Sequence, residues 1–318
     1  MTTTTSAPTG APAATEVPLE PPRQRQGGRL PYGLVFPAAF MLALALGYPL
    51  VRQVFLSFHE YGLAQQFGRA ADFVGLDNYE ALITDGYLWK VLARTVVFCL
   101  VNAAVTMVLG MAVALLMRLM AGPVRLLVQA GLLLAWAMPV VASLTVWQWL
   151  FDTQYGVINW TLTRLGADYE GHSWLLQPLS FFFVATVIVV WMSVPFVAFT
   201  GYAALTQVSE DLTEAAALDG ASAWQRLRHV VLPSIKPVLL IIGLLQIIWD
   251  LRVFTQIYVL QKAGGVTRDT NLLGTYIYRL GIGGGDFGTA AAVAMFMLAL
   301  TVVMTAPYVR IMLKNEEE

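Results

Sequence analysis

The side chains best suited to chemistry lie in a long apolar run near residue 250, at the spacing of one helical face. This stripe holds Gln246, Trp249, Asp250 and Val253, at positions i, i+3, i+4 and i+7, which share one side of an α-helix. A carboxylate and an amide can hydrogen-bond hydroxyl groups, and an indole face can cover the C–H side of a pyranose ring. The stripe therefore predicts a surface that binds a sugar-like ligand.

A second stripe has the same spacing in the apolar run before it and holds Val189, Met192, Ser193 and Phe196. The alternative interpretation of the two stripes is that Trp249 and Phe196 simply pack against their neighbours. Asp250 would then pair with a basic group, such as Arg252 or one on a partner chain. Positions 250 and 252 point to different faces of a helix, so a direct pair between them is not favoured.

The elements that must position these stripes follow from the composition, which is 58% apolar and only 12% charged. Soluble domains carry about 25% charged residues, so the chain is predicted to be a membrane protein. Six apolar runs reach the ~20 residues that a helix needs to cross a bilayer, and all must be helical because lipid offers no partner to open backbone groups. The predicted spans are 34–56, 91–116, 125–150, 179–204, 238–260 and 288–312.

This pattern defines an all-α membrane protein with a six-helix domain over 31–312. Residues 1–30 are rich in Thr, Ala, Pro and Gly and are predicted to be a disordered cytoplasmic tail, and 313–318 form a short cytoplasmic C-terminal tail. Lys and Arg are more frequent in the loops on the side of the N-terminus, which places both termini in the cytoplasm.

The same orientation places the loop 205–237 in the cytoplasm, and this loop contains the string EAAALDGA. Asp211 to Glu214 has the spacing of a capping box, with Ser209 as an alternative cap. Alanines propagate the helix, and Gly220 provides a left-handed stop. A second short helix is expected around 223–230. The loop is thus predicted to be a helix-turn-helix at the inner mouth of the bundle.

The loop resembles the EAA loop of the membrane subunits of bacterial ABC importers, and it lies between the fourth and fifth of six spans, as in that family. Further motifs resemble the maltose and glycerol-phosphate type sugar permeases, and particularly the first of their two subunits. They are FVGLDNYEAL at 73–82, IWDLRVFTQIYVL at 248–260 and GDFGTAAAV at 285–293.

The resemblance implies the type I permease fold, in a multi-pass subunit of the bacterial plasma membrane. Its first loop helix would couple to a cytoplasmic ATPase through Glu214, Ala215, Ala216, Asp219, Gly220 and Ala221. The implied partners are a second homologous permease subunit, two ATPase copies and an extracytoplasmic sugar-binding protein. The implied sugar path comprises Met192, Ser193, Phe196, Gln246, Trp249, Asp250 and Val253.

The chain has no GxxxxGK[ST] string, so ATP and Mg²⁺ are expected on the ATPase, with no cofactor, metal or nucleic acid on this chain. A di- or oligosaccharide is the expected cargo. Two alternatives stay open: the same machinery carrying glycerol phosphate or another polyol derivative, and a stand-alone secondary transporter. An intramembrane enzyme is disfavoured, because no serine–histidine, His-Glu or paired-aspartate signature lies within the spans.

Overall fold

The computed structural model describes Thr2 and residues 30–317. The predicted disordered tail at 1–30 lies outside the described residues, apart from Thr2 and Leu30. The chain divides into two units, 1–50 and 51–318, and each is described by itself. Helix α1 (Leu30–Leu42) continues through one π-helical turn, η1 (Ala43–Gly47), into α2 (Tyr48–Ser57), and the division between the two units falls within α2. Residues 35–57 form a helix that is long and apolar enough to cross a membrane.

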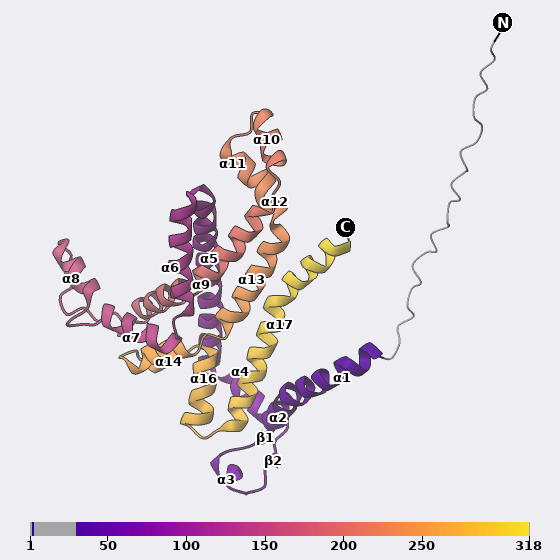
Figure 1. The fold of residues 1–318 in the computed structure, drawn as a ribbon. Helices are drawn as coiled ribbons and strands as arrows, with labels where there is room; N and C mark the ends of the chain where they lie inside the picture. The colour runs from indigo at the N-terminus through magenta and orange to yellow at the C-terminus, as the bar shows by residue number, and fades with distance from the viewer. Residues whose placement is uncertain (1, 3–29, 318) are drawn as a thin grey trace. The chain divides into compact units, whose positions relative to one another are not determined.

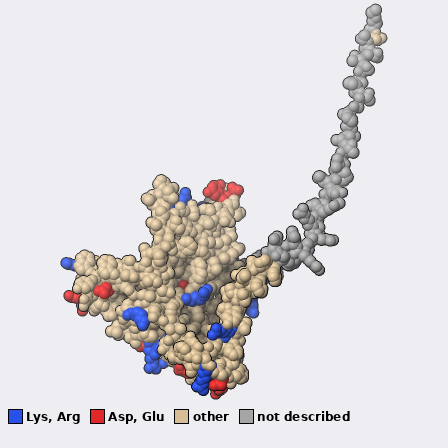
Figure 2. Space-filling view, turned by 60° about the horizontal axis from the view of Figure 1, so that its bottom comes forward, with Lys and Arg blue, Asp and Glu red and all other residues tan. Residues whose placement is uncertain are grey.

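Four further helical segments in the described residues are long and apolar enough to cross a membrane, and a sixth candidate is a bent helix pair. The all-α prediction is therefore confirmed. The segments are α5 (Gly86–Leu119), α9 (Pro178–Thr206), α13 (Lys236–Leu251) followed by α14 (Thr255–Lys262), and α17 (Phe287–Glu317). Figure 2 shows that charged side chains occupy only small parts of the visible surface, as lipid exposure requires.

The bent pair consists of α6 (Gly122–Ala137) and α7 (Val140–Leu150), which meet at an angle of 101°. The sequence predicts one kinked span over 125–150, but the structure shows two separate helices. The cause is Pro139, which has no N–H to donate and forces the residue before it out of the helical region. Met138 accordingly has ψ 128°, and its backbone is extended.

The fifth apolar run is also interrupted. The sequence predicts a helix over 238–260, whereas α13 ends at Leu251 and α14 begins at Thr255. The N–H groups of Arg252 and Val253 bond three residues back, to Trp249 and Asp250, which tightens the last turn. Polar side chains near Asp250 are therefore placed at a helix end.

The core of the second unit is the long contact between α5 and α9. Two glycines permit this close approach: a Cβ atom on Gly110 would lie 2.5 Å from Cβ of Val197, and one on Gly201 would lie 2.6 Å from Sδ of Met111. Small residues at a helix crossing let membrane helices approach closely. Nearer the start of α9, its buried side chains Phe181 and Ile188 pack in one cluster with Leu144 of α7 and Ile257 of α14.

One end of this unit carries short elements that join the helices (Figure 1). The FVGLDNYEAL and GDFGTAAAV motifs meet there on the segment 57–61: Asn78 Nδ2 donates to the carbonyls of Ser57 and His59, and the N–H of Gly288 donates to Tyr61. The elements at this end are β1 (His59–Glu60) antiparallel to β2 (Asp72–Phe73), α3 (Leu63–Gln66), α4 (Asp77–Thr84), α16 (Leu273–Tyr278) and the π-turn η3 (Arg279–Gly283). Two further short helices are α8 (Val157–Arg164), which follows α7 along the chain, and α15 (Thr267–Thr270), which precedes α16.

The loop between the fourth and fifth apolar segments lies at the opposite end of the unit (Figure 1). It contains α10 (Glu210–Leu218), α11 (Ala223–Arg226), the π-turn η2 (Leu227–Val231) and α12 (Leu232–Ser234). The predicted helix-turn-helix is therefore present, but its caps differ. Ser209 occupies the N-cap of α10, without a side-chain bond, and Asp211 lies inside the first turn. A capping box forms instead between Ser222 and Gln225.

Candidate functional site

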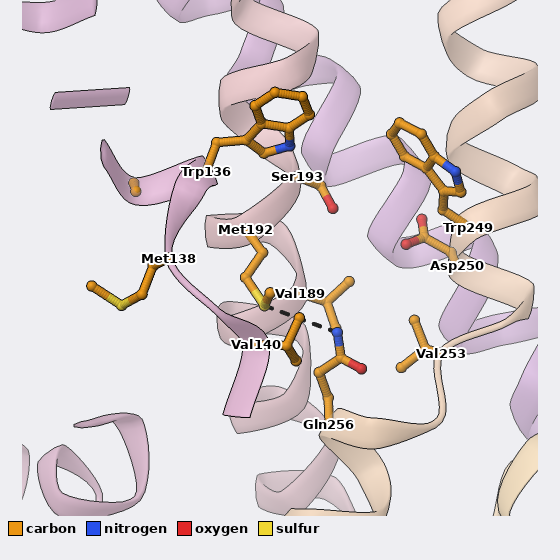
Figure 3. Close-up of a pocket in the computed structure, with 11 residues that line it drawn as sticks. Trp136, Met138, Val140, Val189, Met192, Ser193, Trp249, Asp250, Val253 and Gln256 are labelled. Atoms are coloured by element: carbon orange, nitrogen blue, oxygen red, sulfur yellow. Dashed lines mark hydrogen bonds between the residues drawn. The ribbon is translucent and has the colours of Figure 1, made fainter. Parts of the chain in front are cut away.

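A cavity of about 260 Å³ lies where the two interrupted segments meet α9 (Figure 3). Broken helices expose backbone ends and polar side chains at a depth where a continuous helix would bury them. Residues from the α6–α7 break, from α9, and from the α13–α14 break line this cavity: Ala135, Trp136, Met138, Val140, Val189, Met192, Ser193, Trp249, Asp250, Val253 and Gln256.

Asp250 is the only acidic residue among those lining residues. Its side chain is 2% exposed, and both carboxylate oxygens accept from Nε2 of Gln246, each at 3.0 Å. The Gln246 amide lies one helical turn from Asp250 and holds its carboxylate in place. The remaining lone pairs of the carboxylate can accept hydrogen bonds on the side of the cavity. Gln246 is fully buried and does not line the cavity, and its own Oε1 has no hydrogen-bond partner among the described residues.

Aromatic rings stand beside the carboxylate. Trp249 is 40% exposed, and its ring meets Phe196 edge-on, with 4.8 Å between centroids. Phe196 in turn lies 6.5 Å from Trp136 on the bent helix pair. Figure 3 shows Trp136 and Trp249 on opposite sides of the cavity, with Ser193 between them. A carboxylate, a hydroxyl and two indoles around one space can bind a ligand that has hydroxyl groups on one edge and C–H groups on the other.

The structure thus brings five of the seven predicted path residues to one cavity: Met192, Ser193, Trp249, Asp250 and Val253. Val253 lines the cavity although it follows the end of α13. The prediction that Val253 continues the helical stripe of Gln246, Trp249 and Asp250 is therefore wrong. Phe196 lines an adjoining apolar groove between α6 and α9. Gln246 stands behind Asp250. Whether these residues contact the cargo stays a prediction.

The sequence reasoning missed the residues contributed by the bent pair and by α14. Trp136, Met138 and Val140 flank Pro139, and Gln256 donates through Nε2 to Sδ of Met192 at 3.9 Å (Figure 3). The signal for the first three was Pro139 in the middle of an apolar run, because discontinuous membrane helices often mark a binding site. Nothing comparable in the sequence pointed to Gln256.

The second predicted site is the helix α10, whose C-terminal end closes in a Schellman motif. Gly220 has φ +83°, as predicted, and its N–H donates to Ala217, while the N–H of Ala221 donates to Ala216. Most predicted coupling residues are exposed: Glu214, Ala215, Asp219 and Gly220. So are three large apolar side chains, with Leu212 53%, Leu218 90% and Trp224 65% exposed.

Apolar helical segments, two of them interrupted beside the cavity at Asp250, define a multi-pass membrane protein. Residues 80–312 match the family described as binding-protein-dependent transport system inner membrane component. The chain therefore belongs to this family of ABC importer permeases, whose members are transport subunits of the plasma membrane and work with separate ATPases.

Several relatives align with this chain over most of their own length. The diacetylchitobiose uptake system permease protein of Streptomyces coelicolor is 43% identical over 92% of this chain and 90% of its own. The sulfoquinovosyl glycerol transport system permease protein of Agrobacterium fabrum is 33% identical over 87% and 88%. The trehalose/maltose transport system permease protein of Thermococcus litoralis is 32% identical over 89% and 93%.

A solved structure shares the fold. A chain of a bacterial ABC transporter involved in the import of the acidic polysaccharide alginate superposes with a TM-score of 0.75, covering 90% of this chain and 95% of that one, at 21% identity. The predicted permease fold is thereby confirmed.

Proposed function

We propose that this chain is the membrane subunit of an ATP-driven carbohydrate importer and forms half of the path for a di- or oligosaccharide. The observation that carries the proposal is the cavity at Asp250, Trp249 and Ser193, which combines hydrogen-bonding groups with indole faces inside the bundle. The relatives named above take up diacetylchitobiose, trehalose or maltose, and a sulfosugar glycoside. All of these contain saccharide units.

The polarity of the cavity favours hydroxyl groups over a phosphate group beside Asp250. Asp250 would repel phosphate, and no Lys or Arg occurs among the described lining residues. This argues against the glycerol-phosphate alternative. The cavity opens between helices of one subunit, and its volume is slightly below the range typical of small-molecule sites, about 300–1,000 Å³. A homologous second permease would complete it.

The helix α10 is the proposed coupling helix, with its exposed apolar and acidic residues seated in a cleft of a cytoplasmic ATPase. Glu214 would offer its carboxylate to a donor group of that cleft, and Gly220 would permit the sharp turn that follows. Closure of two ATPase copies would move the two coupling helices together and rock the bundles between inward-facing and outward-facing states.

In this scheme the loop 205–237 and both termini are cytoplasmic, and the end with β1 and α16 faces outward and receives cargo from an external sugar-binding protein. ATP and Mg²⁺ bind to the ATPase, and this chain itself carries no cofactor. Among the described residues, no group of three His, Cys, Asp or Glu side chains is placed to hold a metal ion.

The test is ATP-driven uptake of radiolabelled diacetylchitobiose and maltose by proteoliposomes that contain the chain, its partner permease, its ATPase and its binding protein. We expect Glu214→Ala and Gly220→Trp to lower uptake and sugar-stimulated ATP hydrolysis at least tenfold, because both act on the proposed ATPase contact. Asp168→Ala, at an exposed carboxylate in the loop after α8 and away from α10, serves as the control and should retain uptake. Full activity in both coupling variants would refute the role of α10.

A further inference from the structure

A second, larger cavity of about 490 Å³ lies between α14 and the α16–η3 segment, toward the end proposed to face outward. Its lining residues are Tyr258, Gln261, Lys262, Thr267, Thr275, Tyr278, Arg279, Ile282 and Gly283. None of these described residues is acidic, and two are basic. The chemistry of this outer cavity is therefore the reverse of that at Asp250, where an acid stands without a base.

Helix α14 joins the two cavities. Gln256 near its start lines the inner one, whereas Tyr258, Gln261 and Lys262, spaced i, i+3 and i+4, line the outer one. Because an α-helix rises 1.5 Å per residue, Gln256 and Lys262 lie about 9 Å apart along the axis of α14. That separation is comparable with the length of a disaccharide, so one extended ligand, or two successive positions of a moving one, can span both cavities.

An aromatic cluster forms one wall of the outer cavity. The rings of Phe254 and Tyr258 stack with 5.5 Å between centroids, and Tyr278 meets Tyr258 edge-on at 5.1 Å. Hydrogen bonding to Tyr258 raises the pKa of Tyr278, so this phenol stays protonated. The wall offers apolar ring surface together with hydroxyl groups, which suits the face and edge of a sugar ring.

The cationic groups supply strong donors beside this wall. Lys262 and Arg279 are exposed, and Nζ of Lys262 lies 5.6 Å from the centroid of the Tyr258 ring. The side-chain amide of Gln261 also lines this cavity, but its Nε2 already donates to Oγ1 of Thr270 and Oδ1 of Asn271. The donors facing a ligand are thus mainly charged, and charged donors favour carbonyl or carboxylate oxygens over hydroxyl groups.

We propose that this outer cavity is a second saccharide subsite on the transport path, selective for a sugar unit that bears an acyl carbonyl or a carboxylate. The proposal deepens the function proposed above and rests on it. Cargo arriving from outside would first lay its ring against Tyr258 and Tyr278, with its acceptor group between Lys262 and Arg279. It would then advance along α14 toward Asp250, where its hydroxyl groups find an acceptor.

Cysteine protection tests this subsite directly, because the single native cysteine, Cys99, is fully buried. Ile282→Cys places a thiol in the lining at a residue that is 64% exposed. In nanodiscs, labelling of this thiol by a polar maleimide is measured with diacetylchitobiose, digalacturonate or cellobiose present. We expect the first two sugars to slow labelling at least fivefold and cellobiose to have little effect. Arg279→Gln added to Ile282→Cys should remove the protection.

Leu165→Cys, at an exposed position outside both cavities, is the matched control and should label at the same rate with every sugar. Equal protection by all three sugars would overturn the selectivity, and no protection by any of them would overturn the subsite. The uptake assay separates this result from the proposed function. Uptake without protection refutes only the subsite, whereas protection without uptake leaves the subsite standing and refutes the importer.

Discussion

At the scale of single residues, the inner cavity depends on how one carboxylate is held. Gln246 and Asp250 are one turn apart, and the amide bonds both carboxylate oxygens while remaining out of contact with the cavity. The sequence placed both residues in the same stripe and gave them the same role. The packing gives them different positions: the Gln246 amide orients the Asp250 carboxylate, and only the carboxylate lines the cavity.

We expect Asp250→Asn to lower sugar uptake about tenfold to a hundredfold while the complex still assembles. The replacement keeps the size of the side chain but removes a charged acceptor, and hydrogen bonds to charged groups contribute about 1.5–3 kcal/mol. Uptake kinetics in proteoliposomes and co-purification of the ATPase measure the two effects. Asp168→Asn, an exposed loop carboxylate, is the control, and unchanged kinetics in Asp250→Asn would exclude the assigned role.

At the scale of elements, the helices are positioned by two kinds of interruption and one close crossing. Pro139 turns a predicted span into two helices at 101°. The fifth apolar run is interrupted where α13 ends at Leu251, but it is not bent in this way. Both breaks open onto the same cavity. The crossing of α5 and α9 holds the scaffold around it, with glycine at the points of closest approach.

The crossing gives a stability prediction. Gly110→Ala should lower the free energy of unfolding by about 1–3 kcal/mol, because the added methyl group would overlap Val197 and force the helices apart. Gly131→Ala, on α6, has no neighbouring atom within 4 Å of the new Cβ and should be neutral or slightly stabilising. Thermal unfolding of the purified variants in one detergent compares them, and equal melting temperatures would contradict the packing argument.

At the scale of the whole molecule, the two ends of the unit 51–318 have different surfaces. One end carries the α10–α12 loop, and the other carries β1, β2 and α16 (Figure 1). Leu218 is exposed at the first end, and the outer cavity lies beside α16. The proposed direction of transport requires the first end to be cytoplasmic and the second to be external.

Thiol labelling from one side of the membrane tests this orientation. In intact cells, a membrane-impermeant maleimide should label Leu165→Cys and leave Leu119→Cys, at the end of α5, unmodified until the membrane is opened. Both positions are well exposed, at 78% and 84%, and buried Cys99 gives no background. Labelling of Leu119→Cys from outside would reverse the topology and move the ATPase contact away from α10.

The amino-acid sequence by itself determined the class of this protein. The apolar runs, the EAAALDGA loop and its glycine turn are local features, since hydropathy and the left-handed backbone of Gly220 need no distant partner. The stripes at Met192–Phe196 and Gln246–Asp250 were also readable from helical periodicity.

Only the tertiary structure decided which of these residues share a cavity and where the helices stop. Pro139 was visible in the sequence, but the size of its bend and the approach of Trp136 to Trp249 depend on packing between helices. The same is true of Lys262 on α14 and Arg279 on η3, which line one cavity only because the tertiary structure brings these two elements together. Hydropathy acts residue by residue, whereas a binding site needs side chains brought together from distant parts of the chain.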